Sequence, residues 1–293
     1  MDEGQDSPFD LHGKTVVVTG GNSGIGLGMA RALAVAGADV AIWGTSEAKN
    51  AAALEALSAY GTKVIALRCD VGDDDQVRLA FDETIEAFGG VDTCFANAGV
   101  SPPTMARFEE LPLEQWRSLM RINLDGVFLT FQAAARHMIA AGGGSLVAVS
   151  SIMGTYRVID RSAPYAASKA GLTGLVRAVA FDLARHGIRV NAILPGFIET
   201  AMTDTMLSNE RFAQRSLPRL LGRRWGTPDD LGGVAVYLAS DASRYQTGSE
   251  IVIDGGYVVS LSPYLPSLSN IEYTIIRSMR TTNGAGVVGW SKL

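Results

Sequence analysis

Only two of the 293 residues are cysteines, Cys69 and Cys94, and both lie in apolar, strand-like stretches. They have no neighbours at metal-binding or disulfide-framework spacing, so they predict reduced thiols of a buried core. Histidine is almost as scarce, and His12, His137 and His186 are scattered along the chain. We therefore expect no metal site.

Clustered basic residues and long apolar runs are missing as well. The net charge is −5, without a long run of either sign, which argues against a nucleic-acid or anionic-membrane partner. No apolar run approaches the roughly 20 residues of a membrane-spanning helix. The acidic start over residues 1–8 lacks the basic and apolar parts of a secretion signal, so the expected location is the cytoplasm.

Short runs rich in Val and Ile alternate with longer helical patterns through residue 257. Most of these runs are too uniformly apolar for strands with one exposed face, so they predict a parallel sheet covered on both sides. Right-handed crossovers then give an α/β fold, a doubly wound sheet of about seven strands with helices on both faces. The predicted strands are 14–18, 39–43, 63–67, 91–95, 145–149, 189–193 and 250–253, and the predicted helices are 24–37, 46–60, 73–88, 113–140, 163–186 and 227–239.

A single domain over residues 10–257 is predicted, because no repeat or linker divides that stretch. The composition changes afterwards: residues 258–293 contain one Ala and six Ser, and Pro263 and Pro266 favour an irregular connector. We expect 258–293 to be a partly irregular appendage with a short amphipathic piece around 271–279.

The last three residues, Ser291-Lys292-Leu293, match the peroxisomal targeting signal. A receptor reads this tripeptide only in a eukaryote. Peroxisomal location is therefore the alternative to the cytoplasm if the source is eukaryotic, and a chance ending is the other explanation.

A glycine-rich turn follows the first predicted strand and opens the first predicted helix. Its sequence over residues 19–26 is Thr-Gly-Gly-Asn-Ser-Gly-Ile-Gly. Glycines at such a turn allow positive φ and a close approach of the backbone to a pyrophosphate, which the helix N-terminal amides then bind. A tight turn without a ligand is the alternative. The residues predicted to bind a dinucleotide here are Gly20, Asn22, Ser23, Gly24, Ile25 and Gly26.

Tyr165 and Lys169 lie four residues apart in the predicted helix 163–186. Residues at this spacing share one face of a helix, so the ammonium can sit beside the phenol. A phenol titrates near pH ~10, and a nearby cation favours the phenolate, so the pair predicts a Tyr165 pKa displaced towards neutrality. Such a pair can donate a proton to a carbonyl under reduction or accept one from an alcohol under oxidation.

The glycine turn and the tyrosine–lysine pair together resemble the short-chain dehydrogenase/reductase family. Three residues and then one separate Gly20, Gly24 and Gly26, which is the spacing of that family, and the run Pro-Tyr-Ala-Ala-Ser-Lys over 164–169 matches its second motif. The resemblance covers about residues 10–257. It implies a Rossmann-like fold and an NAD(P)-dependent oxidoreductase that interconverts a carbonyl and a secondary alcohol.

The same resemblance implies four catalytic residues. Tyr165 is the general acid and base, and Lys169 lowers its pKa and bonds the nicotinamide ribose. Ser151 corresponds to the serine that donates a hydrogen bond to the substrate oxygen, and Asn123 to the asparagine that holds a water leading to Lys169. The alternatives are an ordinary serine that ends a strand and a packing asparagine on a helix.

Further cofactor contacts are implied by resemblance. Asp70 ends the third predicted strand and matches the aspartate that contacts adenine, and Asn97-Ala98-Gly99 matches the turn beside the adenosine. Pro195-Gly196 and Thr200 match the segment that holds the nicotinamide carboxamide. The implied cofactor-binding residues outside the glycine turn are Thr45, Ser46, Asp70, Val71, Asn97, Ala98, Gly99, Tyr165, Lys169, Pro195, Gly196, Ile198 and Thr200.

NADP(H) is favoured over NAD(H) by residues 43–46, Trp-Gly-Thr-Ser. Relatives that prefer NAD usually carry an acidic residue near Gly44, which repels a 2′-phosphate, and this chain has none. The arginine that NADP-preferring relatives often place near Thr45 is missing too. Hydroxyls and amides at Thr45 and Ser46, helped by Lys49, can receive the phosphate.

Loops at the carboxyl ends of the strands, 101–104, 152–159 and 199–225, are expected to form the substrate pocket. Their apolar residues either line that pocket as a lid or pack the lid onto the domain. Basic residues in the third loop either attract an anionic acyl carrier or form a solvated or subunit-contact cluster. The apolar set is Ile152, Met153, Tyr156, Met202, Met206, Leu207 and Phe212, and the basic set is Arg215, Arg219, Arg223 and Arg224.

The expected substrate is a small-molecule ketone or secondary alcohol. A reductase of 3-oxoacyl thioesters (carrier protein or coenzyme A) is the alternative, and the lack of basic residues over 138–144 argues against it. A non-catalytic nucleotide sensor on the same fold is a remote alternative, because such proteins usually lose the tyrosine or the lysine. The resemblance also implies a homotetramer through the predicted helices 113–140 and 163–186 and the last strand.

Overall fold

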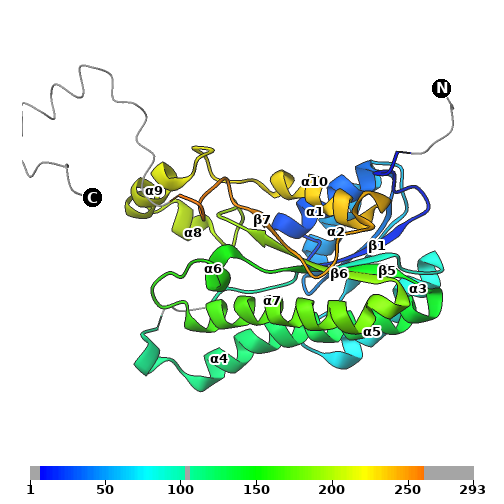
Figure 1. Ribbon diagram of the computed structural model, residues 1–293, viewed down its shortest axis with the longest axis horizontal. Coiled ribbons are helices and arrows are strands. Elements are labelled where there is room, and N and C mark those ends of the chain that lie inside the picture. Colours follow the sequence, from blue (N-terminus) through cyan, green and yellow to red (C-terminus); the bar gives the residue numbers. More distant parts are fainter. Residues whose placement is uncertain (1–6, 103–105, 261–293) are drawn as a thin grey trace, which may run out of the picture.

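The computed structural model describes residues 7–102 and 106–260. Its strands form a parallel sheet in the order β3-β2-β1-β4-β5-β6-β7, with helices on both faces (Figure 1). This confirms the predicted Rossmann-like α/β class. The strands are β1 (Thr15–Thr19), β2 (Asp39–Gly44), β3 (Val64–Arg68), β4 (Thr93–Ala96), β5 (Gly144–Val149), β6 (Ile188–Pro195) and β7 (Glu250–Ile253).

The strands are apolar throughout because both faces of the sheet are covered. In β1, Val17 belongs to one hydrophobic cluster, whereas Val16 and Val18 belong to the cluster on the opposite face. All three side chains are fully buried. Successive side chains of a strand point to opposite faces, so a run of valines places core residues on both sides at once.

Helices α1 (Gly24–Val35), α2 (Glu47–Ser58) and α10 (Gly232–Ala239) cover one face, and α3 (Asp74–Phe88), α5 (Gly126–Ala141) and α7 (Ala163–Leu183) cover the other (Figure 1). Polar side chains cap two of these helices. Ser46 accepts a hydrogen bond from the Lys49 amide at the start of α2, and Asp73 accepts one from the Gln76 amide at the start of α3. The lid region contains two short helices, α8 (Asp204–Leu207) and α9 (Glu210–Ser216).

The predicted helix 113–140 is not uniform. It consists of α4 (Leu113–Met120), a π-helical turn η2 (Arg121–Asp125) and α5. The π turn holds Asn123, whose side chain is completely buried. A single π turn inside an α-helix commonly marks a functional position.

Residues 261–293 lie outside the described residues. The appendage expected from 258 onwards, its amphipathic piece around 271–279 and Ser291-Lys292-Leu293 therefore stay predictions. In the part of the chain that is described, no helix combines the length and apolarity needed to cross a bilayer.

Candidate active site

A cavity of about 500 Å³ lies at the carboxyl ends of β1, β2, β4 and β5. Most of the predicted site residues line it, namely Gly20, Asn22, Ser23, Gly24, Ile25, Thr45, Ser46, Asp70, Val71, Asn97, Ala98, Gly99, Tyr165, Lys169 and Thr200. Predicted residues that do not line it are Gly26, Asn123, Ser151, Pro195, Gly196 and Ile198. Lys49, expected to help receive the 2′-phosphate, and Met202, from the apolar set of the substrate loops, line it too. Lining residues without a predicted role are Trp43, Gly44, Cys69, Val100, Ile122, Val149, Ser150 and Ala201.

The glycine turn forms one wall of this cavity and requires its glycines. Gly20 and Gly24 have φ of 63° and 53°, the left-handed region that glycine alone adopts readily. A Cβ on Gly26 would lie 2.2 Å from the Gly20 carbonyl oxygen, so the turn can close onto the start of α1 only without a side chain there. The Ser23 side chain does not cap α1. The turn therefore leaves room for a pyrophosphate at the helix N-terminus, and its residues fit a dinucleotide.

Thr19 fastens the turn 97–99 to the end of β1. Its hydroxyl accepts hydrogen bonds of 3.0 Å from the amides of both Asn97 and Ala98. The Asn97 amide group in turn donates to the Thr19 carbonyl oxygen over 2.9 Å. The Asn97 side chain is thus occupied in joining β4 to β1, and the backbone of 97–99 borders the cavity.

Asp70 is anchored before any ligand binds. One carboxylate oxygen accepts from the Gly72 amide and the other from the Arg121 guanidinium, each over 3.0 Å. Arg121 lies 51 residues away in the chain, and its contact was not predicted from the sequence. The neighbouring thiol of Cys69 is buried, which raises its pKa to about 12, so it stays protonated and unreactive at neutral pH.

Residues 43–46 lie beside a pair of hydrogen-bonded side-chain amides, Asn22 and the buried Asn50, which was not predicted from the sequence. Asn50 donates to the carbonyl oxygens of Gly44 and Leu67, and accepts a 2.7 Å hydrogen bond from the side chain of Asn22. A Cβ on Gly44 would lie 2.1 Å from the Asn22 amide nitrogen. An acidic side chain at Gly44, which would disfavour a 2′-phosphate, therefore has no room while Asn22 bonds Asn50.

The first turns of α7 bring Tyr165 and Lys169 to the end of β5. The Tyr165 hydroxyl shares a hydrogen bond with the Ser151 hydroxyl, and the latter also accepts from the Met153 amide over 3.0 Å. The Lys169 ammonium lies 5.8 Å from the centre of the Tyr165 ring and donates to the Val149 carbonyl oxygen over 2.8 Å. These contacts bring three predicted catalytic residues together at one edge of the cavity.

The predicted direction of the Tyr165 pKa is wrong for this structure. Burial of the phenol raises its pKa above the ordinary value, and the hydrogen bond from Ser151 opposes this only partly. Lys169 is not among the groups that oppose this burial, and its own pKa is lowered from 10.5 to about 8 by desolvation. Tyr165 is therefore a neutral proton donor at pH 7, as a carbonyl reduction requires.

Asn123 joins the π turn to the end of β4 instead of lining the cavity. Its side chain accepts from the Val100 amide over 2.8 Å and donates to the Val100 carbonyl oxygen over 3.0 Å. It also donates to the Ser168 hydroxyl, one residue before Lys169. The role predicted for its side chain, holding a water, stays a prediction.

The lowered pKa of Lys169 predicts a pH-dependent stability. The unfolded chain keeps this proton up to pH 10.5, whereas the folded chain releases it near pH 8, so between these values the unfolded state binds more protons. The contribution of Lys169 to the free energy of unfolding is therefore lowest below pH 8 and rises with pH through that window. Urea melts of the wild type and of Lys169→Met measure this effect. Between pH ~7 and ~9.5, the free energy of unfolding of the wild type should rise by up to about 2 kcal/mol relative to that of the variant. A difference in the free energy of unfolding between the two proteins that does not change with pH would contradict this prediction.

The substrate loops mostly pack onto the domain. Ile152 and Met153 belong to the hydrophobic core, and Phe212 stacks on Trp225 with ring centres 6.1 Å apart. Met202 does line the cavity. Of the basic set, Arg224 forms a two-pronged ion pair with Asp230, over 2.6 and 2.7 Å, and so stabilises the end of the lid.

Known proteins with related sequences share this architecture. A family profile described as enoyl-(acyl carrier protein) reductase matches residues 20–258. The chain is 37% identical over 254 residues to a 2-dehydro-3-deoxy-D-gluconate 5-dehydrogenase of Escherichia coli K12, covering 86% of this chain and 98% of that protein. It is 38% identical to a 3-oxoacyl-(acyl-carrier-protein) reductase of Chlamydia pneumoniae, over 84% of this chain and 97% of the relative.

A solved structure adds a bound cofactor to the comparison. The gluconate 5-dehydrogenase of Burkholderia cenocepacia, solved with NADP and tartrate, is 36% identical. It superposes with a TM-score of 0.82, and the match covers 87% of this chain and 98% of that one.

Proposed function

The chain belongs to the short-chain dehydrogenase/reductase family, and from this premise we propose that Tyr165, Ser151 and Lys169 form its catalytic group, with Asn123 in support. The protein is an NAD(P)-dependent oxidoreductase that interconverts a carbonyl and a secondary alcohol. The observation that carries the proposal is the Tyr165–Ser151 hydrogen bond beside the cavity that the glycine turn borders. A non-catalytic sensor does not agree with relatives that are named oxidoreductases.

Residues of the chain transfer the proton to the substrate oxygen and stabilise the charge that develops on this atom. A nicotinamide cofactor bound in the cavity would supply the hydride. Tyr165 donates its hydroxyl proton to the carbonyl oxygen as that atom gains electrons, and Ser151 donates a hydrogen bond to the same oxygen. Lys169, still charged at pH 7, stabilises the phenolate left behind. Alcohol oxidation runs the same proton transfer backwards.

NADP(H) is proposed as the preferred cofactor. Gly44 excludes the carboxylate that would repel a 2′-phosphate, and Lys49 lines the cavity at the same end. The NADP-bound relative supports the choice. The glycine turn, Asp70 and the turn 97–99 are proposed to bind the rest of the dinucleotide.

A small polyhydroxylated ketone or alcohol is the proposed substrate, by analogy with the two relatives that act on sugar acids. A 3-oxoacyl-thioester reductase is the second candidate, supported by the 38% identical relative. NADPH- and NADH-linked assays over sugars, sugar acids, cyclic ketones and acyl thioesters should give turnover with the sugars or the sugar acids, and a lower KM for NADPH than for NADH. Turnover of acyl thioesters alone would select the second candidate.

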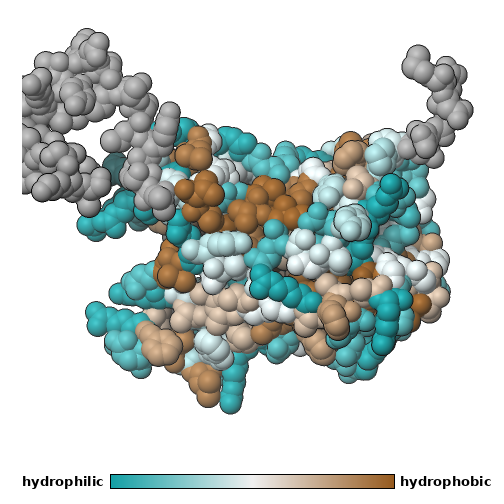
Figure 2. All heavy atoms as spheres, in the orientation of Figure 1, coloured by the Kyte–Doolittle hydropathy of each residue, from teal (hydrophilic) through white to brown (hydrophobic). Residues whose placement is uncertain are grey.

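A homotetramer in the cytoplasm is proposed for the assembled protein. The sheet ends at β7, and Figure 2 shows apolar side chains gathered over this edge. Its residues Ile251 and Ile253 are only partly buried in the single chain. Cys69 and Cys94 are both buried free thiols, as expected in a reducing compartment. Light scattering after size exclusion measures the assembly directly, and a monomer would refute this proposal.

A further inference from the structure

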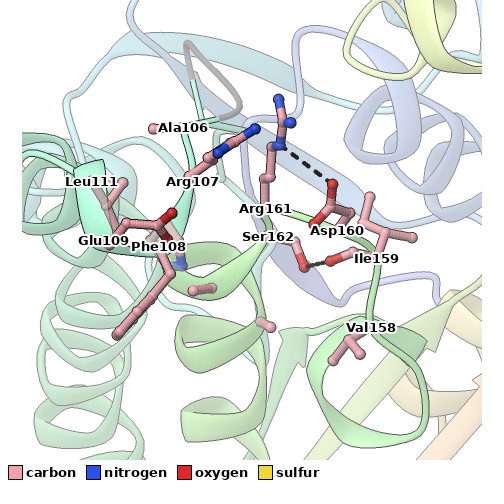
Figure 3. A pocket seen from close by; sticks show the side chains of 13 residues that line it. Ala106, Arg107, Phe108, Glu109, Leu111, Val158, Ile159, Asp160, Arg161 and Ser162 are labelled. Carbon is pink, nitrogen blue, oxygen red and sulfur yellow. Dashed lines mark hydrogen bonds and ion pairs between the residues drawn. The ribbon is translucent and has the colours of Figure 1, made fainter.

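A second cavity, of about 640 Å³, lies against the first turn of α7. Its walls come from residues 106–109 and Leu111 before α4, from the loop 158–162, and from Ala163, Pro164 and Ala166 of α7 (Figure 3). None of these residues has a role predicted from the sequence, except that 158 and 159 belong to a predicted substrate loop. Tyr165 lies between the α7 residues that form this wall, and its own side chain faces the nucleotide cavity.

Two arginine side chains give one end of this cavity a positive charge. Arg107 and Arg161 both line it, and Figure 3 shows their guanidinium groups at the same end, with the Glu109 side chain set apart from them. Within residues 7–102 and 106–260, no ion pair involves Arg107. The Asp160 carboxylate pairs with the Arg161 Nε over 3.3 Å, but its side chain is 89% exposed, so water weakens this attraction. The arginine end of the cavity therefore favours an anion.

The backbone at Arg161 supports a role for its side chain. Its φ is 58°, a left-handed conformation that is unfavourable for a residue with a Cβ. Glycine would adopt this conformation without strain. The loop is fixed around it by the buried Ser162, whose hydroxyl donates to the Ile159 carbonyl oxygen over 2.6 Å. A strained residue beside a cavity is a reason to look for function.

The remaining walls suit a short carbon skeleton. Phe108 and Val158 line the cavity and are 77% and 72% exposed, although both are large and apolar. Tyr165 lies in the first turn of α7 between Pro164 and Ala166, which line this cavity, while its own side chain lines the neighbouring nucleotide cavity.

We propose that Arg107 and Arg161 form a subsite for a carboxylate on the substrate, at the end remote from the carbon that is oxidised or reduced. The physiological substrate is then a hydroxy or oxo acid, not a neutral sugar or ketone. This inference rests on the proposed oxidoreductase function and names its substrate class. Guanidinium groups bind carboxylates in a planar, two-pronged geometry that neutral hydroxyls do not match.

The test compares pairs of substrates that differ only in this group: D-gluconate with D-sorbitol, and 4-hydroxycyclohexanecarboxylate with its carboxamide, each with NADP and NAD. The wild type should prefer the acids in kcat/KM. In Arg107→Gln, KM for the acid should rise about 10- to 100-fold with kcat nearly unchanged, because the interaction is equal in the ground and transition states. Arg107→Lys should recover part of the loss.

A second variant separates function from folding. Arg161→Gly removes the guanidinium and also the backbone strain, so the preference for acids should fall while Tm stays the same or rises. Arg185→Ala, which changes an exposed arginine at the far end of α7, is the matched control and should keep the preference. An equal preference for neutral substrates in the wild type, or an acid preference that survives both variants, would overturn the subsite and leave the oxidoreductase assignment intact. Failure to turn over any member of either pair would overturn the substrate class itself, and the subsite with it.

Discussion

Replacing Tyr165 with Phe is expected to lower kcat by about 10²- to 10⁴-fold while the protein stays folded and binds NADPH as before. The phenol hydroxyl is the group placed to exchange a proton with the substrate oxygen, and Phe removes it without changing the ring. The Ser151 hydroxyl loses one partner but keeps the Met153 amide, so the free energy of unfolding should fall by only about 1 kcal/mol.

The measurements are steady-state kinetics with the best substrate of the screen and NADPH binding by fluorescence. Tyr245→Phe is the matched control, because Tyr245 is fully exposed in the described chain and the same single oxygen is removed. Turnover above about a tenth of the wild-type rate in Tyr165→Phe would exclude the tyrosine as the proton donor.

Replacing Gly26 with Ala is expected to abolish tight cofactor binding. The new methyl group would lie 2.2 Å from the Gly20 carbonyl oxygen and 2.6 Å from the Asn97 amide nitrogen, so the turn must open. Opening it displaces the helix N-terminus that is proposed to bind the pyrophosphate. We expect at least about a 100-fold higher Kd for NADPH and a loss of about 1 to 3 kcal/mol in the free energy of unfolding.

Gly233→Ala is the control for this substitution. Gly233 lies in α10, and a Cβ there would meet nothing within 4 Å. Alanine at this position should raise the stability by about 0.5 to 1 kcal/mol and leave Kd unchanged. Titration of NADPH by calorimetry and urea melts measure both quantities. Normal NADPH affinity in Gly26→Ala would show that the turn does not form the phosphate site.

Local sequence patterns were sufficient to predict the fold and most residues of the nucleotide cavity. Apolar runs such as Val16–Val18 indicate strands that are buried on both faces. The glycine turn can be recognised from the eight residues 19–26 alone. The i and i+4 spacing of Tyr165 and Lys169 placed both on one side of α7. Each of these inferences depends on neighbours in the sequence.

Contacts between distant segments could not be predicted in this way. The pairing of Asn50 with Asn22 and of Arg121 with Asp70 depends on how strands and helices meet, and polar residues on a helix give no sign of their partner. The direction of the Tyr165 pKa was wrong for a related reason. A spacing rule includes the nearby cation but not the loss of water on burial, which dominates here.

The tight contact between Gly44 and Asn22 constrains how cofactor preference can evolve. A carboxylate at position 44 must displace the Asn22 amide, which lies 2.1 Å from the Cβ position, and so break its hydrogen bond to Asn50, the residue whose side chain bonds the ends of β2 and β3. A switch towards NAD at this site therefore requires two coordinated mutations, with the smaller side chain at position 22 arising first. If the acidic residue at position 44 arose first, the single mutant would lose the hydrogen bond between Asn22 and Asn50. The proposed preference for NADP(H) therefore depends on the combination of residues 22 and 44 and not on one residue alone.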